Sequence, residues 1–196
     1  VTLKDCDNVN VIFGDAMKLD LSEIIKDQFG DMPVVVCANL PYYITTPIIT
    51  ALIEGDLPLK NLVVMVQKEV ADRIIATPGT KNYGAISVLC QYYTEPERVC
   101  TVGANMFVPP PKVDSAVVKM VFRNTPAVSV RDEKMFFKTV KAAFSQRRKT
   151  LLNCLVSNFT HTKAELMELM ESVGIEPTRR GETLSLDEFA RLSDIL

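Results

Sequence analysis

One apolar run constrains the fold most: Pro33–Ala38 reads PVVVCA, without a charged side chain. Such a run is typical of a parallel strand that helices cover on both faces. Asn61–Val66 (NLVVMV) is a second run of this kind. Between the two, Thr46-Pro47 is a typical helix start and predicts a helix through about Ile53. Strands that alternate with helices in this way predict an α/β sheet.

The rest of the first two thirds continues this alternation. Val9–Phe13 is predicted to be a short strand, and helices are predicted over Glu69–Ala76 and Ala85–Tyr93. Glu97–Val102 and Ser115–Phe122 are predicted to form an antiparallel pair with a proline-rich connection between them. Residues 1–126 are therefore expected to form a layered α/β domain.

The last third of the sequence has only helical patterns. The longest, Glu133–Phe159, has an apolar stripe at helical spacing, and capping signals mark two later helices. The capping residues are Thr162 with Glu165, Gly174, and Ser185 with Glu188. We expect a small all-helical domain over residues 127–196.

Composition excludes several kinds of chemistry. The five cysteines form no C-x-x-C pair, and the single histidine is His161. A disulfide framework and a zinc site are therefore not expected, and no metal is predicted. The apolar runs are far shorter than the ~18 residues that a membrane span needs. We expect a cytoplasmic protein that does not bind membranes.

The net charge of −2 conceals a segregated pattern of charges. Residues 131–150 carry seven lysines and arginines against two acids, whereas residues 164–196 carry three against eight. On a helical wheel, most of these basic residues fall on one arc beside the apolar stripe. We interpret the arc as a surface for nucleic-acid phosphates, with an ordinary solvated face as the alternative. Its expected contacts are Lys134, Lys138, Lys141, Arg147, Arg148 and Lys149.

The turn Asn39–Tyr43 (NLPYY) follows the first apolar run, at the end of a strand where α/β sheets bind ligands. A plain turn is the alternative, because Asn and Pro are common turn residues. The exocyclic amine of a nucleobase is a poor nucleophile, and two acceptors on its hydrogens would free its lone pair. The Asn39 side chain and the Leu40 carbonyl can supply these acceptors. Pro41 fixes the backbone, and Tyr42 offers a face on which a flipped base can stack.

Six sequence blocks resemble the bacterial 16S ribosomal RNA adenine dimethyltransferases. In chain order they are VCANLPYYITTPII, MVQKEVADRI, TPGTKNYGAISVL, FVPPPKVDSAVV, FSQRRKTLLN and RRGETLSLDEF. The adenine N6-methyltransferases of macrolide resistance, which act on large-subunit RNA, share fewer blocks and rank second. The resemblance implies a Rossmann-like methyltransferase domain followed by a small helical domain. It also implies transfer of methyl groups from S-adenosylmethionine to the N6 of adjacent adenines in 16S ribosomal RNA during ribosome biogenesis.

The resemblance further implies roles for single residues. The catalytic positions are Asn39, Leu40, Pro41 and Tyr42. Phe107 matches an aromatic residue that stacks on the other face of the target base, with a core phenylalanine as the alternative. The expected donor-binding residues are Asp15, Ala16 and Asn39. The basic block around Arg147 supports RNA binding, so the small-subunit precursor is the expected partner, with no obligate protein partner evident.

One departure from the family pattern concerns the methyl donor. The family binds it with a glycine-rich loop after the first strand, whereas the eight glycines here contain no G-x-G. We therefore expect a piece that lacks the first two strand–helix units and is inactive by itself. Val34–Ala38 should then lie at an open edge of the sheet, covered by Val9–Phe13 or by another chain. A non-catalytic RNA-binding or ribosome-assembly factor is the alternative function.

Overall fold

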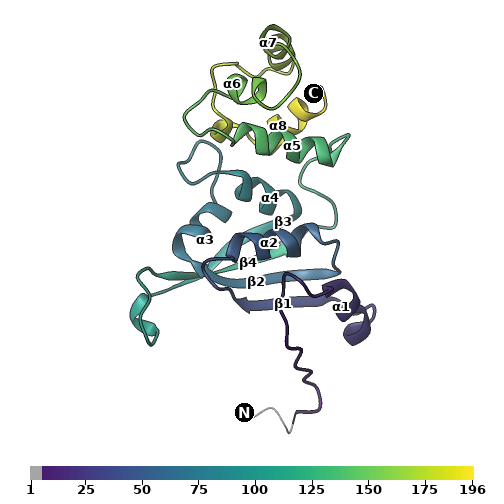
Figure 1. The fold of residues 1–196 in the computed structure, drawn as a ribbon, viewed down its shortest axis with the longest axis vertical. Coiled ribbons are helices and arrows are strands. Elements are labelled where there is room, and N and C mark those ends of the chain that lie inside the picture. Colours follow the sequence, from purple (N-terminus) through teal and green to yellow (C-terminus); the bar gives the residue numbers. More distant parts are fainter. Residues whose placement is uncertain (1–5) are drawn as a thin grey trace.

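A computed structural model describes residues 6–196 of the chain (Figure 1). Its sheet has four strands in the order β1-β2-β4-β3. β1 (Val34–Asn39) and β2 (Leu59–Gln67) are parallel, whereas β4 (Ser115–Phe122) pairs antiparallel with both β2 and β3 (Thr94–Val102). The predicted α/β sheet and its antiparallel pair are confirmed.

Three helices lie between the sheet and the helical part of the molecule (Figure 1). They are α2 (Thr45–Glu54), α3 (Lys68–Ile74) and α4 (Ala85–Tyr93), close to their predicted bounds. A further helix, α1 (Leu21–Phe29), precedes β1 and is one that the sequence patterns missed. Its N-cap is Asp20, whose carboxylate accepts from the Glu23 N–H at 3.0 Å.

The strands bury alternate residues. In β2, Leu62, Val64 and Val66 are fully buried, and the residues between them are only half-buried. The prediction that these strands are covered on both faces is wrong, since Val35 of β1 is 52% exposed. These apolar strands therefore have one face that helices cover and one face that the helices of residues 6–196 leave accessible.

The prediction of a strand over Val9–Phe13 is also wrong. These residues have no regular secondary structure, and the Phe13 side chain is fully exposed. A mainly apolar pentapeptide such as VNVIF forms a strand only where a neighbouring strand pairs with its backbone, and this segment has no such pairing within residues 6–196. β1 lies at the sheet edge, as expected, but Val9–Phe13 does not cover it.

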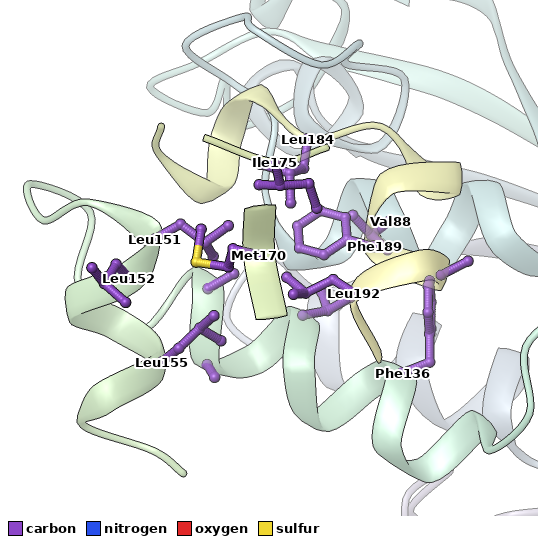
Figure 2. Packing of buried hydrophobic residues seen from close by; sticks show 14 of the residues in the cluster. Val88, Phe136, Leu151, Leu152, Leu155, Met170, Ile175, Leu184, Phe189 and Leu192 are labelled. Atoms are coloured by element: carbon purple, nitrogen blue, oxygen red, sulfur yellow. The ribbon is translucent and has the colours of Figure 1, made fainter. Parts of the chain in front are cut away.

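The helical part contains four helices around a core of its own (Figure 2). They are α5 (Glu133–Ala143), α6 (Leu151–Val156), α7 (Lys163–Ser172) and α8 (Leu186–Ser193). Both predicted capping boxes are present, at Thr162 and at Ser185. No helix formed by residues 6–196 has the length and apolarity of a membrane span. The division into residues 1–126 and 127–196 stays a prediction.

Helix α4 joins the two cores. Val88 and Tyr92 are buried in the core of the helical part, whereas Leu89 and Cys90 are buried in the core of the sheet. Opposite faces of one short helix thus fix the helical part against the sheet. Burial raises the pKa of the Cys90 thiol to about 12, so this cysteine packs as an inert apolar group.

The predicted long helix over Glu133–Phe159 is interrupted. α5 ends at Ala143 and α6 begins at Leu151, with a turn between them. Tertiary hydrogen bonds hold this turn: the Leu151 N–H donates to the Arg179 carbonyl at 2.7 Å, and the Arg147 guanidinium donates to the Lys81 carbonyl at 2.7 Å. The helical wheel therefore does not apply beyond Ala143.

Candidate active site

The turn after β1 is held in register with the neighbouring strand. Asn39 ends β1 opposite Met65 of β2, and the Leu40 N–H donates to the Met65 carbonyl at 3.1 Å. The Leu40 side chain is buried in the core of the sheet, whereas the Asn39 side chain is exposed. The turn thus lies at the carboxyl ends of two parallel strands, where α/β sheets bind ligands.

Two adjacent carbonyl groups of this turn differ in their hydrogen bonds. The Pro41 carbonyl accepts from the Thr45 hydroxyl at 2.9 Å and from the Ile44 N–H at 3.2 Å. Within residues 6–196, no donor is bonded to the Leu40 carbonyl, and the Asn39 side chain has no hydrogen-bond partner. These two acceptors are therefore not occupied by any donor of residues 6–196.

Tyr42 is the aromatic residue of the turn, and its hydroxyl is bonded to a distant strand. It lies 2.8 Å from the Ser115 hydroxyl, at the first residue of β4. The Tyr42 side chain is half-buried, whereas that of its neighbour Tyr43 is 88% exposed. Of the two tyrosines, only Tyr42 is tied to the sheet.

Phe107 lies in the long connection between β3 and β4, just after the short 3-10 helix η1 (Ala104–Met106). This connection projects from the sheet (Figure 1). The Asp114 carboxylate accepts from the Ala104 N–H at 3.0 Å, and the Asp114 carbonyl accepts from the Lys68 N–H at 2.9 Å. The base of the connection is thereby fixed at the carboxyl end of β2. Phe107 is half-buried, and no aromatic pair within residues 6–196 joins it to Tyr42.

An ion-pair cluster joins α3 to β3 near the base of this connection. The Asp72 carboxylate accepts from the Lys68 ammonium at 3.2 Å and from the Arg98 guanidinium. Burial opposes ionisation of Asp72, but the hydrogen bonds from Lys68 and Arg98 outweigh it and lower the pKa of this carboxyl. Lys68 and Arg98 are thus neutralised locally, which leaves them less charge for a phosphate.

Asp15 and Ala16 lie in an exposed turn before α1. The Asp15 carbonyl accepts from the Lys18 and Leu19 N–H groups, and its carboxylate accepts from the Met17 N–H at 3.0 Å. All of these hydrogen bonds are local, and none of them joins this turn to Asn39. Within residues 6–196, no hydrogen bond therefore joins Asp15 or Ala16 to Asn39, and their shared role in donor binding stays a prediction.

The predicted basic arc separates into two surfaces. Lys134, Lys138 and Lys141 line one groove of about 700 Å³. Its lining also includes the aromatic residues Tyr93 and Phe137 and the acids Glu54 and Glu133. The Lys138 ammonium lies 4.6 Å from the centre of the Phe159 ring. We call this the α5 groove.

The second surface is a cleft of about 660 Å³ between the sheet layer and the helical part, which we call the interlayer cleft. Arg147 and Lys149 contribute to it from the α5–α6 turn, and Arg148 lies in the same turn. Lys81 and Arg180 line it as well, the latter just before η2 (Gly181–Thr183). Four cations from three separate loops therefore meet in this cleft. Its lining also includes Arg73 and the acids Glu69, Asp72 and Glu182.

Ser115, Lys81 and Arg180 are the residues of these sites that sequence reasoning missed. Ser115 lies within the block FVPPPKVDSAVV that begins at Phe107, and this was the only signal for it. Lys81 and Arg180 are isolated basic residues in the sequence, with no pattern to distinguish them. Only tertiary structure brings them to Arg147.

Comparisons with known proteins agree on one family. The model of the ribosomal RNA adenine dimethylase family matches residues 2–196. The chain is 50% identical to ribosomal RNA small subunit methyltransferase A of Bacillus pumilus and 52% identical to that of Bacillus cereus. Each alignment covers 100% of this chain and 68% of the relative.

Two solved structures have the same fold. A dimethyladenosine transferase from Plasmodium falciparum superposes with a TM-score of 0.74 at 27% identity, over 95% of this chain and 71% of that one. The 23S rRNA methyltransferase ErmE superposes with a TM-score of 0.60 over 84% of this chain and 65% of its own, at 21% identity, which bears on the fold alone. The Rossmann-like methyltransferase fold is confirmed, and with the whole-length family match it follows that the chain belongs to the ribosomal RNA adenine dimethylase family.

Proposed function

We propose that the chain carries the target-adenine site of an S-adenosylmethionine-dependent enzyme that dimethylates N6 of adenines in small-subunit ribosomal RNA. One observation carries the proposal: the exposed Asn39 side chain and the Leu40 carbonyl, which have no donors of their own within residues 6–196, lie beside the tethered Tyr42. The names of the Bacillus relatives support the small subunit as the substrate. Such a substrate and the five cysteines, which form no C-x-x-C pair, support a cytoplasmic location.

Asn39 and Leu40 act on the nucleophile in this mechanism. The Asn39 side-chain oxygen and the Leu40 carbonyl accept the two hydrogens of the adenine N6 amine. This draws the nitrogen toward a pyramidal geometry, in which its lone pair points at the incoming methyl group. Pro41 fixes the direction of the Leu40 carbonyl, because the proline ring restricts the backbone on both sides of the peptide. No strong general base is needed, since the amine becomes acidic once it has been alkylated.

Tyr42 and Phe107 bind the base in this proposal. A target adenine that has left its RNA helix loses stacking, and an aromatic side chain restores about 1–3 kcal/mol per base. In this proposal Tyr42 supplies one face of the pocket, and we assign the opposite face to Phe107, which lies in the projecting connection. The half-buried state of both rings leaves part of each accessible to a base.

The methyl donor supplies an electrophilic methyl group on a sulfonium sulfur. The exposed Asp15 carboxylate, the Ala16 backbone and Asn39 are the residues of this chain that we assign to it. Asp15 and Ala16 fit this role chemically, because a carboxylate can accept from an adenine amine and the Ala16 N–H can donate to an adenine ring nitrogen. The local turn around Asp15 leaves its carboxylate 51% exposed.

The α5 groove and the interlayer cleft are the proposed RNA phosphate contacts. Lysine and arginine side chains without acid partners release counterions when they meet phosphates. No ion pair within residues 6–196 engages the predicted contacts, namely Lys134, Lys138, Lys141, Arg147, Arg148 and Lys149. Lys81 and Arg180 join the set through the cleft.

Methyl transfer to small-subunit precursors tests the proposal. The gene product that contains these residues is incubated with labelled donor, and the methylated nucleosides are identified by mass spectrometry. Asn39→Ala is expected to lower kcat by about 10²-fold or more, as loss of a transition-state contact does. Asn124→Ala, at an exposed position away from the turn, is the matched control.

Two outcomes would overturn the assignment. If wild type and Asn39→Ala methylate alike, the turn does not act on the amine. If wild type binds the precursor without methylating it, the non-catalytic assembly factor is the better function. Methylation of large-subunit RNA in preference to small-subunit RNA would identify the other substrate class.

A further inference from the structure

We propose that Ser115 is a positioning residue for methyl transfer: its hydroxyl holds the Tyr42 ring in the orientation in which the target base stacks. The inference rests on the proposed function, in which Tyr42 forms one face of the base pocket. It adds a residue that contacts neither the base nor the methyl donor and that acts through Tyr42.

Ser115 is a rigid anchor. It is 1% exposed and begins β4, the strand between β2 and β3. Its backbone pairs with Gln67 on one side and with Val102 on the other. The preceding residue, Asp114, is bonded through its carbonyl to the Lys68 N–H. A hydroxyl on such a backbone has little freedom to follow the motion of a loop.

Tyr42 needs an anchor because its own segment is a turn. The backbone of the turn is fixed at Leu40 and Pro41, but these bonds leave the tyrosine ring free to rotate about its side-chain torsions. The bond of 2.8 Å to Ser115 is the one hydrogen bond of the Tyr42 hydroxyl within residues 6–196. Tyr43 shows the alternative state: its ring has no hydrogen-bond partner in the same residues and is 88% exposed.

The position of the Tyr42 ring is expected to affect the rate of methyl transfer more than the affinity for RNA. The adenine amine must meet the Asn39 and Leu40 acceptors and the methyl group together, and a displacement of about 1 Å from such geometry costs as much as ~10²-fold in rate. RNA affinity, in contrast, is spread over many phosphate contacts. Loss of the Tyr42–Ser115 hydrogen bond is therefore expected to lower kcat and to leave the RNA dissociation constant nearly unchanged.

The test uses the gene product that contains these residues and four variants: Ser115→Ala, Ser115→Thr, Tyr42→Phe and the double variant Ser115→Ala/Tyr42→Phe. Ser115→Ala and Tyr42→Phe each remove the same bond, so each is expected to lower kcat about 10-fold, and the double variant no further. Ser115→Thr keeps the hydroxyl and is expected to restore most of kcat. Ser129→Ala, at an exposed position, is the control.

A fluorescent base gives a readout that does not depend on turnover. RNA with 2-aminopurine at the target position is expected to be quenched on binding to wild type and Ser115→Thr, and less so with Ser115→Ala. Wild-type kcat and quenching in Ser115→Ala would overturn the inference, as would additive losses in the double variant. Failure of the proposed function gives a different result: wild type shows no methyl transfer, or Asn39→Ala keeps full activity.

Discussion

The carbonyl groups of Leu40 and Pro41 belong to adjacent residues, yet their surroundings differ. The Pro41 carbonyl is satisfied by Thr45 and Ile44 at the start of α2, whereas within residues 6–196 no donor reaches the Leu40 carbonyl. Polar groups near a protein core are normally paired, so an unpaired acceptor at the end of a strand is suited to a ligand. The structure thus separates the carbonyl that holds the turn from the one that is available to substrate.

Replacing Thr45 by valine should loosen the turn without altering its shape. The side chain is buried, and valine fills nearly the same volume, so the main loss is the hydroxyl that donates to Pro41. We expect a loss of about 1 kcal/mol in stability and a several-fold lower kcat, with unchanged RNA affinity. Thermal unfolding and single-turnover methylation measure the two effects. Wild-type kcat in this variant would show that the Pro41 carbonyl does not position the turn.

Sequence patterns found part of this site. The turn Asn39–Tyr42 stands out because its residue types carry a specific chemistry at the end of an apolar strand. Ser115 does not, since it lies 73 residues from Tyr42 and serine is common at strand ends. A hydrogen bond between two hydroxyls is set by tertiary geometry, which no local pattern encodes.

At the scale of elements, the break between α5 and α6 also arises from tertiary contacts that no local pattern encodes. Residues 144–150 (FSQRRKT) contain neither glycine nor proline, so propensity predicted one continuous helix. Bonds to distant loops, from Leu151 to Arg179 and from Arg147 to Lys81, hold the turn instead. The capped helices were predicted well, because Thr162 and Ser185 act on backbone groups three residues away.

The two basic surfaces should contribute separately to RNA binding. Lys138→Glu/Lys141→Glu alters the α5 groove, and Arg147→Glu/Lys149→Glu alters the interlayer cleft. Each lost phosphate contact removes ~0.7–0.9 from the slope of log affinity against log salt, so each pair should lower the slope by about twice that amount. Filter binding at several salt concentrations measures it. An unchanged slope for one pair would show that its surface is only solvated.

Stability of α8 is expected to depend on pH through Glu188. The Arg179 guanidinium donates to the Glu188 carboxylate, the Ser185 N–H adds a bond at 2.9 Å, and together they lower the pKa of this carboxyl despite its burial. A lowered pKa in the folded state means stability that is present above the ordinary value of 4.5 and is lost as pH falls through the folded value.

Glu188→Gln tests this dependence, because it removes the charge and keeps the shape. At pH 7 we expect it to cost about 1.5 kcal/mol, and at pH 3, below the ordinary pKa of 4.5, the difference from wild type should be smaller. Thermal unfolding at both pH values measures it, with Glu168→Gln on the exposed face of α7 as the control. A difference that is equal at the two pH values would mean that the ion pair does not stabilise α8.

At the scale of the whole molecule, residues 6–196 form two linked cores, and β1 is an edge strand of the sheet. Buried residues of β2, β4 and α4 form the core of the sheet, and α4 links it to the helical part. β1 takes part through Val34, while Val35 on its other face is exposed. The sequence patterns predicted the layers, but they did not predict which face would be covered, since coverage depends on where the helices pack.

The 196-residue chain by itself is expected to bind S-adenosylmethionine negligibly. A donor of this kind is normally held by backbone N–H groups of a glycine-rich loop between a strand and a helix. Here no glycine lies between β1 and α2 or between β2 and α3, and the eight glycines contain no G-x-G. The exposed Asp15 and Asn39 side chains offer acceptors but no such cradle.

Titration calorimetry with the 196-residue chain is therefore expected to show no saturable heat in the micromolar range. Micromolar binding would mean that the chain holds the donor without a glycine-rich loop. The expectation that this chain is inactive by itself would then have no basis.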